Sequence, residues 1–157
     1  MTAIKWTCQA FEQLQPAQLY SILRLRAEVF VIEQDCVYQD MDNFDSQALH
    51  LCGSQDSILI CYARLFAPGV KYPGASIGRV VTAPQARGTG LGRELMRQAL
   101  GQCHRAWPGA TITISAQHHL ERFYNSLDFK TVSAPYLEDG IPHVEMTRTA
   151  AAGTANN

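Results

Sequence analysis

Arg87-Gly88-Thr89-Gly90-Leu91-Gly92 is the stretch of this sequence that decides its fold. It lies between a segment that predicts a strand over 76–82 and an amphipathic segment that predicts a long helix, which begins at Leu91 and ends before Trp107. Glycines let backbone N–H groups approach an anion, and the N-terminus of the following helix favours negative charge. The loop therefore predicts a phosphate or pyrophosphate ligand. The competing interpretation is a tight turn that uses glycine only for its conformational freedom.

Two other anion-binding loops are excluded by their spacing. A P-loop needs Gly-Lys followed by Ser or Thr, and this chain contains no Gly-Lys pair. A dinucleotide-binding loop needs a third glycine where Arg93 stands, and an acidic residue about 20 positions later, where the region around Thr111 has none. The loop belongs to neither class.

Outside the loop, the hydrophobic pattern changes repeatedly between a period of two residues and a helical period. Helices are predicted from Pro16 to Phe30, from Leu91 onward and around 120–127, and strands at 6–10, 48–52, 58–66, 76–82, 111–115, 130–133 and 143–148. The acidic stretch 33–45 is predicted to be irregular or to hold a short helix. This order indicates a layered, mixed α/β architecture, with a single domain over 1–149 and a disordered tail over 150–157.

The composition limits what the protein can do. Of its 157 residues, 46% are hydrophobic and 17% are charged, which excludes a disordered chain, and a formal net charge of −1 offers no basic surface for nucleic acid. The longest apolar run, 58–63, is far shorter than the ~20 residues of a membrane helix, and the N-terminus resembles no secretory signal. Five cysteines without a C-x-x-C pair predict no disulfide scaffold and no zinc site. We therefore expect a cytoplasmic protein without a metal ion.

The glycine loop resembles the acyl-coenzyme-A motif R/Q-x-x-G-x-G/A of the GNAT N-acetyltransferases, including the frequent proline before the arginine, here Pro84. A second family element, an aromatic-Tyr pair before a Leu-Gly-Phe segment, is matched by 123–129, with Asp128 in place of the glycine. Within the family, Arg24–Gln34 and Tyr136–Met146 resemble the terminal signatures of the ElaA-type subfamily. The resemblance covers about residues 6–149 and implies the GNAT fold, a mixed, mostly antiparallel, twisted sheet flanked by helices.

The resemblance also implies an activity, the transfer of the acetyl group of acetyl-CoA to a primary amine by direct attack. The pantetheine arm would contact Gln117 and pair like an added strand with the edge left by a β-bulge, at Val80, Val81 and Thr82. Tyr124 matches the residue that protonates the CoA thiolate. Its spacing alone predicts a packing residue, and both roles can hold. The pyrophosphate would bind the backbone amides of the loop residues Arg87, Gly88, Thr89, Gly90, Leu91 and Gly92.

The general base and the acceptor stay open. The resemblance places Glu33, His143 and Glu145 near the acceptor, and a chain of water molecules could replace any of them as the base. Residues 28–45 hold six acidic and no basic residues, which favours a cationic amine if they border the acceptor groove and is otherwise a solvated loop. The alternative function is a non-catalytic acyl-CoA-binding or sensing module. A homodimer is expected by analogy with the fold family.

Overall fold

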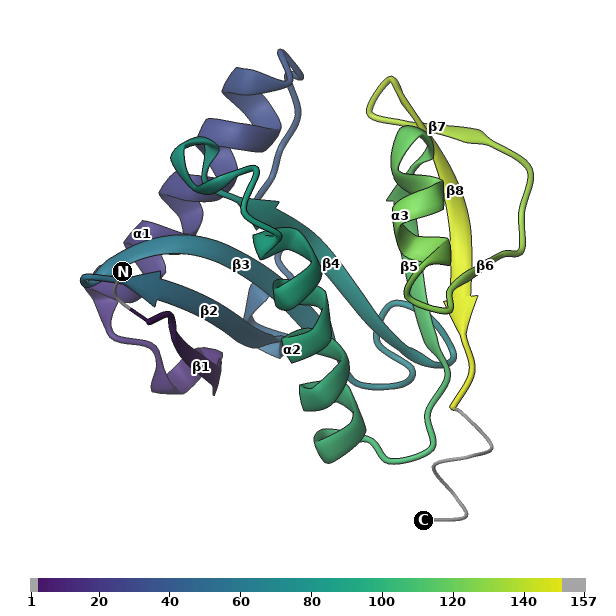
Figure 1. Ribbon diagram of the computed structural model, residues 1–157, viewed down its shortest axis with the longest axis horizontal. Helices are drawn as coiled ribbons and strands as arrows, with labels where there is room; N and C mark the ends of the chain where they lie inside the picture. Colours follow the sequence, from purple (N-terminus) through teal and green to yellow (C-terminus); the bar gives the residue numbers. More distant parts are fainter. Residues whose placement is uncertain (1–2, 151–157) are drawn as a thin grey trace.

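The computed structural model describes residues 3–150, which form an eight-stranded sheet with helices on both faces (Figure 1). The spatial order is β1-β2-β3-β4-β5-β8-β6, with β7 paired to β8 beside this path. The strands are β1 (Lys5–Ala10), β2 (Leu49–Gln55), β3 (Ile58–Phe66), β4 (Ala75–Thr82), β5 (Ile112–Gln117), β6 (Lys130–Thr131), β7 (Tyr136–Glu138) and β8 (Ile141–Arg148). The longer helices are α1 (Pro16–Arg26), which continues as the π-helix η2 (Ala27–Glu33), α2 (Leu91–Ala106) and α3 (Glu121–Asn125). Short 3-10 turns occupy Phe11–Gln13, Asp45–Gln47, Pro84–Ala86 and His118–Leu120.

The sheet confirms the predicted fold class, because every strand pair except β4–β5 is antiparallel. All the predicted helices and strands are present, with shifted ends. The pattern around 120–127 folds as a 3-10 turn followed by the short helix α3, and Asp128 then takes a φ of +69°, the conformation that glycine usually supplies. The expected tail lies, from residue 151 onward, outside the described residues.

One strand, β7, was missed by the sequence analysis. Glu138 pairs with Ile141, so β7 and β8 form a hairpin with the two-residue loop Asp139-Gly140. Both loop residues have positive φ, +51° and +78°. Asp-Gly is the sequence that such a two-residue turn prefers, and it was the available signal for this hairpin.

The apolar core is divided between the two faces of the sheet. Helices α2 and α3 cover one face, where Leu95, Met96 and Tyr124 pack against Cys61, Ala63, Leu65 and other strand residues. Helix α1 and η2 cover the other face, where Ile22, Leu25 and Val29 pack on Tyr62 and Val81. Residues 61, 63 and 65 point to one helix layer and residue 62 to the other, as the two-residue period of a strand requires.

Within residues 3–150, β4 and β5 are the only parallel neighbours, and they soon separate. They pair only at Ala75–Ile112 and Ser76–Thr113, and beyond these pairs the ribbons diverge (Figure 1). On the other side of β4 the register with β3 shifts, and Arg79 at this bulge has a φ of +50°. The far half of β4 therefore has no strand partner on its β5 side.

Candidate active site

A cleft of about 850 Å³ opens where β4 and β5 separate. Its walls come from β4, from β5 with the β7–β8 hairpin, from the end of η2 and from α3. Eight of the residues expected from the sequence line it, namely Glu33, Val80, Val81, Thr82, Arg87, Gln117, Tyr124 and His143. These residues come from segments far apart in the sequence, and all of them line the cleft that opens where β4 and β5 separate.

The glycine loop leads from this cleft into α2. Gly88 and Gly90 have φ values of +82° and +79°, and no atom lies within 4 Å of the place of a Cβ at either residue. They are therefore glycines because of their backbone conformation and not because of crowding. Gly90 is the N-cap of α2, so the first amides of this helix have no acceptor within it. The side chain of Leu91 is buried in the core, which leaves its backbone to face a ligand.

Arg87 and Glu33 form a bidentate ion pair at the mouth of the cleft. The guanidinium donates to both carboxylate oxygens, at 2.8 and 2.7 Å, and both side chains are about 41% exposed. The hydrogen bonds from Arg87 lower the pKa of Glu33. A carboxylate held in this way is a weak base, so the arrangement does not favour Glu33 as the group that deprotonates an amine.

Tyr124 on α3 is packed by its ring and open at its hydroxyl. Its ring meets Phe123 and Phe129 edge to face, at centroid distances of 5.1 and 6.0 Å. Its Oη has no hydrogen-bond partner among the described residues. Because the only buried side-chain N or O atom without a partner there is Nε of Arg64, Oη is not fully sealed in the core, and Tyr124 is one of the residues that line the cleft. Burial raises the pKa of Tyr124 to about 12, so the phenol is protonated at neutral pH.

A polar cluster on β5, β7 and β8 forms the opposite wall. Glu138 accepts a hydrogen bond from Ser115 at 3.0 Å, and its other carboxylate oxygen lies 3.4 Å from Nε2 of His143. The Ser115 and Tyr136 hydroxyl oxygens are 2.5 Å apart, and the Tyr136 ring stacks on His143. Of these residues the sequence analysis identified only His143 as a site residue. Tyr136 and Glu138 lie on β7, which it missed, and Ser115 on the predicted strand joins the cluster only through them.

The backbone fixes how His143 can carry a proton. Its Nδ1 lies 2.6 Å from the carbonyl oxygen of Ile141, which can only accept, so Nδ1 carries a hydrogen. In the neutral ring the lone pair is then on Nε2, beside Glu138. Nε2 is therefore the ring nitrogen that can accept a proton from a group in the cleft. Glu145, two residues further along β8, does not line the cleft.

Two contacts hold the segment after η2 across the cleft. The amide of Gln117 donates to Oε1 of Gln34 at 3.3 Å, and Sγ of Cys36 lies 3.3 Å from the carbonyl oxygen of Asp139. They join this segment to the end of β5 and to the β7–β8 turn. Gln117 is therefore engaged within the protein at the place where the resemblance implies a contact with the pantetheine arm.

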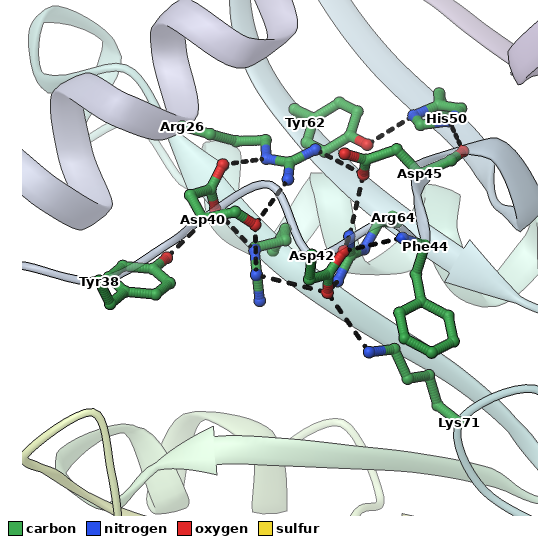
Figure 2. Close-up of polar contacts among 11 residues, drawn as sticks. Arg26, Tyr38, Asp40, Asp42, Phe44, Asp45, His50, Tyr62, Arg64 and Lys71 are labelled. Atoms are coloured by element: carbon green, nitrogen blue, oxygen red, sulfur yellow. Dashed lines mark hydrogen bonds and ion pairs between the residues drawn. The ribbon is translucent and has the colours of Figure 1, made fainter.

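Three of the six acids in the acidic stretch are held in ion pairs with buried arginines, while Glu28, Glu33 and Asp35 are exposed. Asp40, Asp42 and Asp45 accept hydrogen bonds from Arg26 and Arg64, at 2.8 to 2.9 Å (Figure 2). Burial would raise the pKa of Asp42, but the hydrogen bonds from Arg64 and the amide of residue 44 hold it well below its usual value. We call the group of Arg26, Asp40, Asp42, Asp45, Arg64, Lys71 and Arg79 the Arg–Asp network.

Two kinds of feature are missing from the described part of the chain. Over residues 3–150, no helix is long and apolar enough to cross a membrane. No three His, Cys, Asp or Glu side chains in that range are placed to hold a metal ion.

The separated parallel strands, the glycine loop at the N-terminus of α2 and the cleft between them are the features expected from the sequence resemblance to the GNAT N-acetyltransferases. The family model for the acetyltransferase (GNAT) domain matches residues 12–150. The chain is 39% identical over 147 residues to protein ElaA of Escherichia coli, which covers 92% of this chain and 96% of that protein. It therefore belongs to the GNAT acetyltransferase family, in its ElaA-type subfamily.

Solved structures agree with this assignment. An acyl-CoA N-acyltransferase from Pseudomonas aeruginosa has 42% sequence identity and a TM-score of 0.90, over 94% of this chain and 100% of that chain. The crystal structure of Escherichia coli ElaA has 38% identity and a TM-score of 0.88, over 93% and 99% of the two chains. A GNAT acetyltransferase from Elizabethkingia anophelis with acetyl-CoA bound, at 12% identity and a TM-score of 0.67 over 93% and 97% of the chains, shares the fold.

Proposed function

We propose that this protein is a cytoplasmic N-acetyltransferase that moves the acetyl group of acetyl-CoA to a primary amine. The observation that carries the proposal is that the unpaired half of β4 and Tyr124, whose hydroxyl has no hydrogen-bond partner within residues 3–150, line the same cleft. The first offers backbone groups to the donor, and the second offers a proton to its leaving group. All five cysteines are free, as is usual for proteins of the cytoplasm.

The donor fits the residues present. Along Val80, Val81 and Thr82, the edge of β4 that faces away from β3 has no strand partner within residues 3–150, so its backbone groups can pair with the pantetheine amides. An N–H group among them can hydrogen-bond the thioester oxygen as charge develops there. The carbonyl oxygen of Thr82 accepts a hydrogen bond from Arg87 at 3.3 Å, which the pantetheine arm would have to replace. The amides at the N-terminus of α2 supply the pyrophosphate site.

The residues of the cleft have separate roles in the transfer. His143, with Glu138 beside it, accepts the proton from the acceptor ammonium at Nε2. The amine then attacks the thioester carbon, the new C–N bond forms and the C–S bond breaks. Tyr124, which is protonated at neutral pH because burial raises its pKa to about 12, gives its proton to the leaving thiolate. The second proton of the former amine nitrogen, lost as the amide forms, then restores the phenol.

The test is acetyl-CoA-dependent thiol release across a panel of amines, amino acids, polyamines and peptides. Gly90→Glu is the loop variant, because its carboxylate would stand at the pyrophosphate site. Gly109→Glu is the matched control, since Gly109 follows the other end of α2, has the same φ of +79° and also has no atom within 4 Å of its Cβ position. We expect acetyl-CoA binding to be lost only in Gly90→Glu.

Each result has one meaning. Equal binding by the two glutamate variants would reject the loop assignment. Binding of acetyl-CoA without release on any amine would favour the non-catalytic acyl-CoA-binding module instead. A higher rate with propionyl-CoA or succinyl-CoA than with acetyl-CoA would support acyl transfer to an amine but would replace acetyl-CoA as the proposed donor.

A further inference from the structure

The Arg–Asp network holds more positive than negative charge. It contains three carboxylates and four cations, and all seven are joined by contacts of 4.0 Å or less. Its titratable neighbours add no charge, because burial raises the pKa of Tyr38 and of Tyr62 and lowers that of His50. Within the network, the cations therefore exceed the carboxylates by one charge.

This charge lies on the cleft side of the network. Arg26 is fully buried, while the side chains of Lys71 and Arg79 are 29% and 21% exposed. Arg64, Lys71 and Arg79 all line the cleft. Arg64 also has a buried Nε without a hydrogen-bond partner. The wall formed by β4 and the loop before it is thus cationic.

Lys71 and Arg79 are held in place but keep donors free. The Lys71 ammonium lies 3.8 Å from the centroid of the Phe44 ring and 3.3 Å from Oδ2 of Asp42 (Figure 2). An ammonium has three N–H donors, so this leaves capacity for a further acceptor. Arg79 donates from Nε and Nη2 to Asp40, while its Nη1 donates to no group in residues 3–150. Both cations are thus oriented before any ligand arrives.

The facing wall has the opposite character. Glu138 and Asp139 lie there beside His143, and all three line the cleft. Within residues 3–150, no ion pair joins either acid to Lys71 or Arg79. One cleft therefore has an anionic wall with a base and a cationic wall with one charge in excess.

We propose that the acceptor is a zwitterion, an amine that also carries a carboxylate, as amino acids do. Its amine lies beside His143 and Glu138, and its carboxylate is bound by Lys71 and Arg79. A single carboxylate matches the single excess charge, whereas a phosphate monoester carries nearly two. The inference rests on the proposed function and specifies its acceptor.

The experiment compares amines that differ only in the carboxylate. Straight-chain ω-amino acids are assayed beside alkylamines of the same length, and α-amino acids beside their primary amides. We expect the wild-type protein to have a kcat/KM at least about tenfold higher for the carboxylated member of a pair. Lys71→Met should reduce this preference by about ten- to hundredfold, and Lys71→Arg should retain it. Lys5→Met, a change at an exposed residue of β1, is the matched control.

Three results would overturn the inference. The first is a wild-type protein that uses both members of every pair equally well. The second is a Lys71→Met variant whose kcat/KM falls by the same factor for both members of a pair, which would mean that Lys71 has a structural role. The third is the absence of calorimetric binding of any carboxylated amine. If a carboxylated amine binds, and binds more weakly to Lys71→Met, but is never acetylated, the zwitterion site stands and the proposed transferase function fails.

Discussion

Tyr124→Phe removes only the hydroxyl group and tests whether this hydroxyl protonates the leaving thiolate. The Oη of Tyr124 makes no hydrogen bond within residues 3–150, and the ring packs against Phe123 and Phe129 through its carbon atoms. The variant therefore loses no internal contact. We expect its free energy of unfolding to stay within about 0.5 kcal/mol of the wild type.

The expected effect on catalysis is much larger. A positioned general acid typically contributes about 10²–10⁴ in rate, which corresponds to about 2.7–5.4 kcal/mol of activation free energy. The dissociation constant of acetyl-CoA should hardly change, because the hydroxyl acts on the leaving thiolate and not on the bound thioester. A purely structural tyrosine would change neither quantity, since phenylalanine fills the same space.

The assay is thiol release at saturating acetyl-CoA, with thermal unfolding and calorimetric CoA binding on the same preparations. Tyr20→Phe is the control, because Tyr20 is 72% exposed on α1 and is not among the residues that line the cleft. A Tyr124→Phe rate within about threefold of the wild type would refute the acid role. So would a parallel loss of binding and rate, because a general acid is not needed to hold the coenzyme.

Three more predictions concern stability and binding. Arg26→Met should cost about 3 kcal/mol in denaturant unfolding, because Asp40 and Asp45 each lose one of their two cationic partners, while Arg24→Met on the exposed face of α1 should cost under about 0.5 kcal/mol. The free energy of unfolding should fall as the pH drops below about 6.5, with a slope approaching about 1.36 kcal/mol per pH unit, because His50 has a lowered pKa and the unfolded chain binds its proton first. Glu33→Gln should tighten acetyl-CoA binding in calorimetry, because it releases both guanidinium donors of Arg87.

Each of these three predictions would be contradicted by a specific result. A stability that is flat from pH 7 to 5 would mean that His50 is charged in the folded protein. Equal losses in Arg26→Met and Arg24→Met would mean that the network adds no stability. Weaker coenzyme binding in Glu33→Gln would mean that the ion pair holds Arg87 in its binding position.

The sequence predicted the elements of the fold better than the residues of the site. Hydrophobic period and glycine punctuation depend on local physics, so the strands, α1, α2 and the loop at Gly88 and Gly90 could be found. Neighbouring β4 and β5 pair at only two positions before they separate, and no local pattern encodes that separation. The family resemblance supplied the cleft residues Val80, Val81 and Thr82 in its place.

The missed part of the site follows from one missed turn. Asp139-Gly140 closes a two-residue hairpin, and that hairpin places Glu138 next to His143 and Tyr136 next to Ser115. The sequence analysis treated Tyr136 and Glu138 only as part of a terminal signature, and it therefore assigned no contact to either residue. Recognising the Asp-Gly turn would have paired Glu138 with a residue of the following strand and brought its carboxylate to the histidine.

The charge of a segment is a poor guide to the charge that a ligand meets. Residues 28–45 carry six acidic side chains and no basic one, which favours a cationic acceptor if they border the acceptor groove and otherwise predicts a solvated loop. Arg64 lies 22 positions after Asp42 and Arg79 lies 39 positions after Asp40, and the pairing of β3 with β4 brings both arginines to these aspartates. With Arg26 and Lys71 they exceed the three aspartates by one charge, and the exposed members face the cleft. In the folded chain, the three aspartates of this acidic segment therefore hold the cations that form one wall of the cleft. An acceptor amine that also carries a carboxylate matches the charges of this cleft better than an amine without one.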